Sequence, residues 1–319
     1  MKRILKWMNA ILGIVFFIWL AYQFNKEGDD AIKLQYFLAR FSTDNVLWLL
    51  VALMLVPWNI SIDTYKWRLA LQGRYRISQS LAFQAILVGL SVGILTPNRI
   101  GEFAGRLLFV PSRYRIPAAT ATFISSLSAL VVVYFLGGIA LFWYDWPLFF
   151  PEWLKQAGSV IVLFAFSILL SVFFGSNRVL MLLRRLPRGR RFTKYLRFSA
   201  HFSRVALCRL LILSFIRVLV VYVQLFCLAL FVGLSFSFSE AVILFPLLFL
   251  FQAIMPSSVY TDLGVQGGIA YVLFFPIAGS VLLAIMPSYL LWLINVILPA
   301  SVGGVLLINS KRNGFLGNN

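Results

Sequence analysis

The chain has 319 residues, of which 61% are apolar, 16% aromatic and only 12% charged, and its mean hydropathy is +0.91. A soluble domain carries roughly a quarter charged residues, so the composition excludes a water-soluble globule and predicts an all-α, polytopic membrane protein. The 28 Lys and Arg outnumber the 10 Asp and Glu, but they lie mostly between apolar runs. This arrangement indicates orientation in a bilayer and no nucleic-acid partner.

Six apolar runs are long enough to be full spans, since a helix needs roughly 20 residues to cross a hydrocarbon core of ~30 Å. The first run follows basic residues, as in a signal peptide, but it lacks a small-residue cleavage pattern, so we expect an uncleaved span. Two further apolar regions, 81–110 and 240–286, are interrupted by Pro, Gly and charged residues. The predicted spans are Trp7–Phe24, Val46–Ile62, Ala119–Trp143, Gly158–Phe174, Leu210–Val232 and Tyr289–Ile308.

The charges of the connecting segments predict the orientation of these spans. Twenty of the 28 Lys and Arg lie in segments on one side, whereas the other side holds four of them and six of the ten acids. By the positive-inside rule, both termini are cytoplasmic, and we expect a multi-pass protein of the bacterial inner membrane. The basic loop at 177–204 carries nine basic residues, from Arg178 to Arg204, and no acid. We interpret it as a topology determinant, with an interfacial helix that binds anionic lipid headgroups as the alternative.

This orientation constrains the two interrupted regions. The region 81–110 enters and leaves on the cytoplasmic side and is too short for two spans, so it is predicted to be a re-entrant helix pair. The region 240–286 returns to the outside and is long enough for either a re-entrant pair or two full helices. We expect the whole chain, 1–319, to form one transmembrane domain, with an inverted repeat as a possible relation between its halves.

The first interrupted region contains the densest group of charged residues within an apolar run. Its sequence, LTPNRIGEFAGR, runs from Leu95 to Arg106. Pro97 removes a backbone donor and ends the preceding helix, while Gly101 and Gly105 permit a tight turn or a close approach of backbones. A backbone broken at membrane depth must be buried in protein or line a polar cavity, so this segment is a candidate site.

Three charged residues of this segment fall within two helical turns. If Glu102 begins the second half-helix, Arg106 lies at i+4 and the two pair, which leaves Arg99 free in the break. A guanidinium beside exposed half-helix amides suits a phosphate group. The alternative is an ordinary cytoplasmic loop whose arginines set the topology.

The second interrupted region repeats this pattern in the other half of the chain. Between Met255 and Gly268, Pro256 ends an apolar helix, and Asp262 precedes Gly264 and Gly267. Broken helices in both halves are typical of transporters whose binding site lies at the membrane midplane. The alternative for the acid of each break is structural, as a cap that accepts free amides of a half-helix.

Other polar residues within the spans give weaker signals. Arg217 either faces a cavity, where it meets Asp262 or Glu240, or extends to the cytoplasmic interface. The end of the second predicted span is expected at the level of the lipid headgroups, with Asn59, Asp63, Lys66 and Arg68.

At these motifs the chain resembles a known family, the lysylphosphatidylglycerol synthase transmembrane region, also called the flippase-like domain. This family forms the membrane half of the multiple peptide resistance factors and also occurs as short stand-alone proteins. Two features depart from its pattern: Arg106 lies one residue further from Glu102 than the usual arginine, and the frequent Gly-Val-Arg-Glu is here Gly-Val-Gln-Gly at 264–267. The resemblance spans nearly the whole chain and rests on Pro97, Arg99, Gly101, Glu102, Arg106, Trp67-Arg68-Leu69, and Pro256 to Gly264-Val265.

The resemblance implies a domain that moves lipids between leaflets, with lysyl-phosphatidylglycerol as the known cargo of the long members. Those members carry a cytosolic aminoacyl-transfer domain after the membrane part, which is missing here, so we expect no enzymatic activity. The cargo is expected among phospholipids, aminoacyl-phospholipids and polyprenol-linked lipids. No GxxxxGK[ST] sequence occurs, so transport is expected to be passive or ion-coupled. The residues expected to bind the headgroup are Arg99, Glu102, Arg106, Asp262 and Arg217.

Three other functions are compatible with the architecture. They are an ion-coupled transporter of small solutes, a membrane transferase acting on a lipid headgroup, and a non-catalytic partner of a cell-envelope synthase. A transferase needs a catalytic base or metal ligands, and the ten scattered acids with the single His201 argue against it. We expect no cofactor and no metal. The expected partners are membrane lipids, and a homo-oligomer is compatible with the sequence.

Overall fold

The structure is a computed structural model of the whole chain, and it describes residues 43–71, 74–96, 99–144, 152–174, 202–255 and 259–312, with three isolated positions before them. In these segments the chain forms helices joined by turns, without a strand, which confirms the predicted all-α membrane fold. Some predicted features lie outside the described residues. They are the first span except Tyr22, the prolines Pro97 and Pro256, and all but the end of the basic loop.

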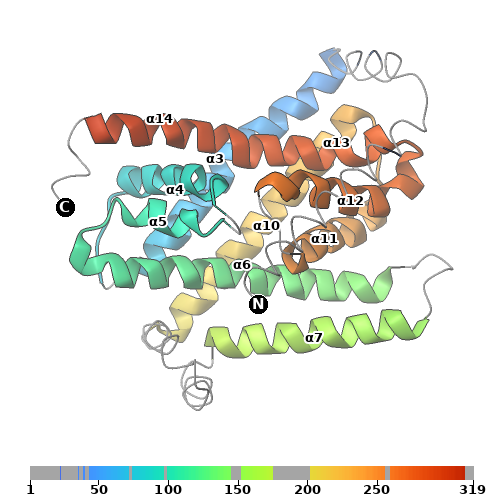
Figure 1. Cartoon of the computed structure of the whole chain (residues 1–319). Helices are drawn as coiled ribbons and strands as arrows, with labels where there is room; N and C mark the ends of the chain where they lie inside the picture. The colour runs from blue at the N-terminus through green and yellow to red at the C-terminus, as the bar shows by residue number, and fades with distance from the viewer. Residues whose placement is uncertain are drawn as a thin grey trace.

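Five helical stretches of the described chain are long and apolar enough to cross a membrane, and each contains a predicted span. The helices α3 and α10 have 29 residues each, which gives a length of about 44 Å at 1.5 Å per residue. Both exceed the thickness of a hydrocarbon core and lie diagonally across the molecule (Figure 1). The stretches are α3 (Thr43–Leu71), α6 (Arg115–Trp143, after the short 3-10 helix Ser112–Tyr114), α7 (Glu152–Phe174), α10 (Arg204–Val232) and Val281–Arg312.

The last of these stretches is longer than the sequence predicts. It comprises α13 (Val281–Trp292), a π-helix at Leu293–Ile297 and α14 (Leu298–Arg312), whereas the predicted span begins at Tyr289. The earlier start includes Pro287 within α13. Proline is tolerated inside membrane helices, where neighbouring groups satisfy the backbone that it frees.

The first interrupted region is a short antiparallel helix pair. The helix α4 (Gln79–Ile94) has 16 residues and α5 (Gly101–Leu107) has seven, so they extend only about 24 Å and 10 Å. Figure 1 shows them side by side at one end of the molecule, with the break between them pointing to its middle. This geometry confirms a re-entrant pair.

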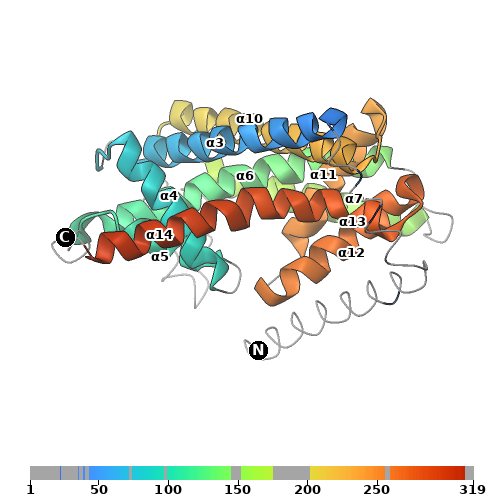
Figure 2. The ribbon, with the colours of Figure 1, turned by 90° about the horizontal axis from the view of Figure 1, so that it is seen from above.

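The second interrupted region forms a pair at the opposite end. The helix α11 (Phe238–Ile254) has 17 residues and α12 (Val259–Ala278) has 20. The start of α12 faces the turn of the first pair, in both views of the ribbon (Figures 1 and 2), and Asp262 pairs with Arg99 of that turn. Neither helix is among the five stretches that are long and apolar enough to cross a membrane, which favours a re-entrant pair, the first of the two alternatives.

The glycines of the two pairs have different roles from those predicted. Gly264 and Gly267 lie buried inside α12 and do not interrupt it, so their assignment as helix breaks is wrong. Gly105 also lies within a helix, whereas Gly101 is the first residue of α5. A Cβ at Gly101 would lie 2.4 Å from the Val92 carbonyl oxygen, and one at Gly105 would lie 2.7 Å from Cα of Gly89. The absence of side chains there lets α5 pack directly on the backbone of α4.

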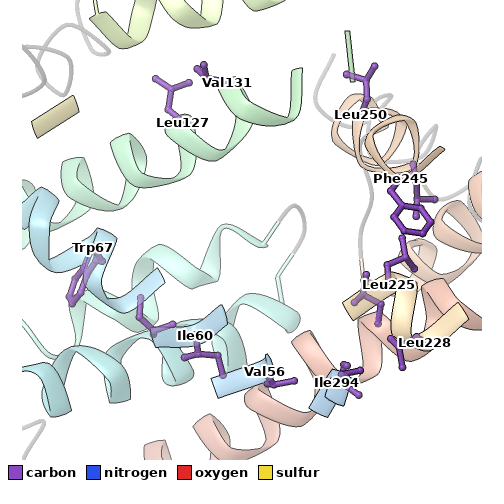
Figure 3. Packing of buried hydrophobic residues seen from close by; sticks show 14 of the residues in the cluster. Val56, Ile60, Trp67, Leu127, Val131, Leu225, Leu228, Phe245, Leu250 and Ile294 are labelled. Atoms are coloured by element: carbon purple, nitrogen blue, oxygen red, sulfur yellow. The ribbon is translucent and has the colours of Figure 1, made fainter. Parts of the chain in front are cut away.

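A continuous apolar core holds these elements together. The helix α3 packs along α10, α4 along α14, and α6 against both α7 and α11. Apolar side chains from the long helices and from the second pair interdigitate between them (Figure 3). Those labelled in the figure are Val56, Ile60, Trp67, Leu127, Val131, Leu225, Leu228, Phe245, Leu250 and Ile294.

Candidate intramembrane charged site

The break between α4 and α5 is a hydrogen-bonded turn around Arg99. This residue has φ = 53°, in the left-handed region, which costs a residue with a Cβ about 1–2 kcal/mol. The Thr96 carbonyl accepts from the Arg99 amide at 3.2 Å, and the Thr96 hydroxyl accepts from the Gly101 amide at 2.7 Å. The threonine therefore satisfies an amide at the start of α5. The turn fixes the direction in which the Arg99 side chain leaves the backbone.

Arg99 joins the two breaks through an ion pair. Its Nη2 donates to Oδ2 of Asp262 in α12 at 3.2 Å, and Trp292 Nε1 donates to the same oxygen at 3.2 Å. The Arg99 side chain remains 41% exposed, whereas that of Asp262 is 14% exposed. The prediction that Arg99 stays free in the break is wrong, because the opposite helix pair supplies a carboxylate.

Arg106 binds two carboxylates in the interior. Its Nη2 donates to Glu102, at i+4 as predicted, and to Oδ2 of Asp63 in α3 at 2.9 Å. Its side chain is only 2% exposed, and its Nε has no hydrogen-bond partner among the described residues. Arg106 thereby fixes the short helix α5 to the long helix α3.

Arg217 completes the pairing of Asp63. Its Nη1 lies 3.4 Å from Oδ1 of Asp63, and its Nε donates to Oδ1 of Asn59 at 2.8 Å. The predicted contacts of Arg217 with Asp262 or Glu240 are wrong, and its side chain is directed to α3 instead, because α10 packs along that helix. It is 34% exposed, so this guanidinium, like that of Arg99, is within reach of a ligand.

Glu240 has a structural role at the exposed start of α11. The Ser237 hydroxyl donates to Oε2 of Glu240 at 2.6 Å, and the Ser237 amide donates to the same oxygen at 2.7 Å. These bonds to Ser237 lower the pKa of the Glu240 carboxyl. The two residues form a capping box, so this acid stabilises the start of α11.

A row of amides extends the charged group to the last helix. Asn59 Nδ2 donates to Asn295 Oδ1 at 2.7 Å, Asn295 Nδ2 donates to Gln224 Oε1 at 3.0 Å, and Gln224 Nε2 donates to the Ala52 carbonyl at 3.0 Å. Asn295 lies in the π-helix between α13 and α14. Such single-turn π-helices are frequent at functional sites. Trp292, the partner of Asp262, lies one turn earlier, so the last long stretch contacts both groups of charged residues.

Lys66 lies beside this group and is completely buried. Its Nζ donates to the Ser125 carbonyl in α6 at 3.2 Å, and it forms no salt bridge within the described part of the chain. A buried ammonium without a paired carboxylate is rare in proteins.

Three polar residues expected at the level of the headgroups, Asn59, Asp63 and Lys66, are all buried between helices. The sequence did not indicate that they would join one buried group. Their spacing of i, i+4 and i+7 puts them on one face of α3, and this spacing is the signal that could have identified them. Arg68, the fourth residue of that group, instead donates to the Ile77 carbonyl and the Gln79 side chain outside the core.

These observations define the class: a multi-pass α-helical membrane protein in which two broken helix pairs bring charged side chains together within an apolar core. The chain belongs to the lysylphosphatidylglycerol synthase TM region family, whose family model matches residues 7–292. The resemblance found in the sequence motifs is therefore confirmed, and it supports a function related to membrane lipids. No curated protein and no solved structure matches the chain.

Proposed function

We propose that the protein moves an anionic lipid between the leaflets of the bacterial inner membrane, with both termini in the cytoplasm. The observation that carries this proposal is the Arg99–Asp262 pair between the two breaks, in which the Arg99 side chain is 41% exposed. Arginine binds phosphate through two parallel hydrogen bonds, so a phosphate headgroup competes with a single carboxylate oxygen for it. The lipid-related family supports the same class of ligand.

Exchange of partners on Arg99 links binding to movement. When a headgroup replaces Asp262 on Arg99, the ion pair between the α4–α5 turn and α12 is broken, and the two helix pairs are free to separate. When the headgroup leaves, Asp262 pairs again and the breaks close. Such alternation between two helix pairs that face opposite sides of the membrane is the usual basis of alternating access.

The two buried or half-buried arginines have different parts in this scheme. Arg106 is 2% exposed and bound to two carboxylates, so it positions α5 and does not itself contact the headgroup in this conformation. Arg217 is 34% exposed, and its Nη2 has no partner among the described residues, so it is a second headgroup ligand in addition to Arg99. Glu102 orients Arg106, as the sequence predicted.

The test is leaflet exchange of fluorescent phosphatidylglycerol in proteoliposomes, measured by quenching of the outer leaflet with dithionite. Arg99→Gln should slow exchange about tenfold or more, since a hydrogen bond to a charged group contributes ~1.5–3 kcal/mol. Asp262→Asn should tighten headgroup binding, because it removes the competing charge from Arg99. Arg113→Gln removes an exposed arginine outside the site and is the matched control.

Three results would count against the proposal. One is wild-type exchange no faster than in protein-free liposomes. Another is an Arg99→Gln variant as fast as the Arg113→Gln control. The third is equal movement of phosphatidylglycerol and of an uncharged diacylglycerol probe, which would show that no headgroup charge is recognised.

A further inference from the structure

The buried charges around Asp63 balance one another without Lys66. Arg106 and Arg217 carry two positive charges, and Asp63 and Glu102 carry two negative charges, each acid in contact with a guanidinium. Guanidinium groups keep their proton in proteins. The ammonium of Lys66 is therefore one positive charge in excess within an interior of low dielectric.

The surroundings of Lys66 offer little to offset that charge. Asp63 is three residues away on α3, but its two oxygens are occupied by Arg106 and Arg217, whose own charges repel the ammonium. Glu102 of α5 is engaged by Arg106, and α6 contributes the Ser125 carbonyl. A buried lysine in such a site gains or loses a proton readily, which an arginine cannot do.

The same cluster holds hydrogen-bond donors that have no acceptor among the described residues. The Arg106 Nε is buried without a partner, and only one of the three N–H groups of Lys66 has an acceptor among the described residues. The negative charge of a headgroup held by Arg217, which shares Asp63 with Arg106, would balance the ammonium. Anion binding and protonation of Lys66 therefore favour each other, as thermodynamic linkage requires.

We propose that Lys66 takes up a proton when an anionic headgroup binds, so that the protein carries a proton together with the anion. This inference rests on the proposed function and adds its coupling ion. The Nζ lone pair accepts a proton from water on the side where the headgroup enters, and Nζ returns it to water on the side where the headgroup leaves. No other bond is formed or broken, and one proton per negative charge makes the transfer electrically neutral.

The experiment measures proton uptake when soluble dihexanoyl-phosphatidylglycerol binds to the purified full chain in weakly buffered detergent solution with a pH indicator dye. The wild type should take up about one proton per bound lipid, according to the linkage between binding and protonation. Lys66→Met should bind without proton uptake. It should remain folded, because the remaining charges are balanced, and Lys66→Gln is a second variant of similar size. Arg113→Gln is the control for loss of a positive charge elsewhere.

Binding by the wild type without proton uptake overturns the inference, whatever the variants do. No binding of the probe by the wild type, or uptake by Lys66→Met equal to that of the wild type, also overturns it. Leaflet exchange is measured separately, so the two proposals can fail separately. Proton uptake without leaflet exchange contradicts the transport function and retains the proton site, whereas exchange without uptake contradicts the coupling alone.

Discussion

The Arg99–Asp262 pair and the Arg106–Asp63 pair consist of the same two residue types, but they differ in burial. Arg99 is 41% exposed and makes one contact of 3.2 Å to its carboxylate. Arg106 is 2% exposed and binds both Asp63 and Glu102. This difference indicates that an arginine in a membrane protein can exchange its carboxylate partner for a ligand only where its side chain is exposed. The Arg99–Asp262 pair can therefore open when a ligand binds, whereas the Arg106–Asp63 pair holds two helices in a fixed position.

The largest expected loss of stability follows the removal of Asp63 from the buried Arg106–Asp63 pair. Asp63→Ala leaves two guanidinium groups without their common carboxylate, and removing one partner of a buried pair costs ~3–5 kcal/mol. We expect the free energy of unfolding in detergent, measured by denaturant titration, to fall by that amount. The double variant Asp63→Leu with Arg106→Met should recover part of the loss, because it removes both charges of the pair but also takes their partners from Glu102 and Arg217. If the double variant is no more stable than Asp63→Ala, the two residues do not stabilise the protein as a pair.

The sequence predicted the helices that carry these charged residues better than it predicted which charged residues pair with one another. The apolar runs identified the five described spans because hydrophobicity and length alone decide which helices cross a bilayer. The i+4 spacing also predicted the Glu102–Arg106 pair. The contacts of Arg99 with Asp262 and of Arg217 with Asp63 join residues more than 150 positions apart. They depend on how helices pack, which neither periodicity nor composition specifies.

The next largest loss of stability is expected for substitution of Gly105, the glycine that lets α5 approach α4. A Cβ at Gly105 would lie 2.7 Å from Cα of Gly89 and 2.8 Å from the Val88 carbonyl oxygen, and backbone atoms cannot move aside. Gly105→Ala should therefore lower the free energy of unfolding by ~1–3 kcal/mol, as overpacking does, and displace Arg106 from Asp63. Gly158→Ala in α7 is the control, because a Cβ there meets nothing within 4 Å. Equal stabilities of the two variants would contradict the close packing of the first helix pair.

A smaller loss of stability is expected when Glu240, an exposed acid outside the site, loses its hydrogen-bond partner Ser237. Ser237→Ala removes the cap of α11 and should cost ~1 kcal/mol. The lowered pKa of Glu240 means that its contribution is present above the ordinary value of 4.5 and is lost as the pH falls through the lower folded value. The difference in unfolding free energy between the wild type and Ser237→Ala should therefore shrink in acid. A difference that is independent of pH would show that the carboxylate adds nothing to the cap.

The smallest effect on stability is expected for the exposed pair, and this prediction separates the two regions most sharply. A double-mutant cycle with Arg99→Gln and Asp262→Asn should give a coupling energy of only ~0.2–1 kcal/mol, because the Arg99 side chain is 41% exposed and its pairing gains little over hydration of its charge. The same substitutions should nevertheless change lipid exchange strongly, since Arg99 is the proposed headgroup ligand. A coupling energy as large as that of Arg106 with Asp63 would mean that the Arg99–Asp262 pair also holds its two helix pairs in a fixed position. Its carboxylate would then be too tightly held to give way to a phosphate, and the partner exchange that opens the two breaks would not occur.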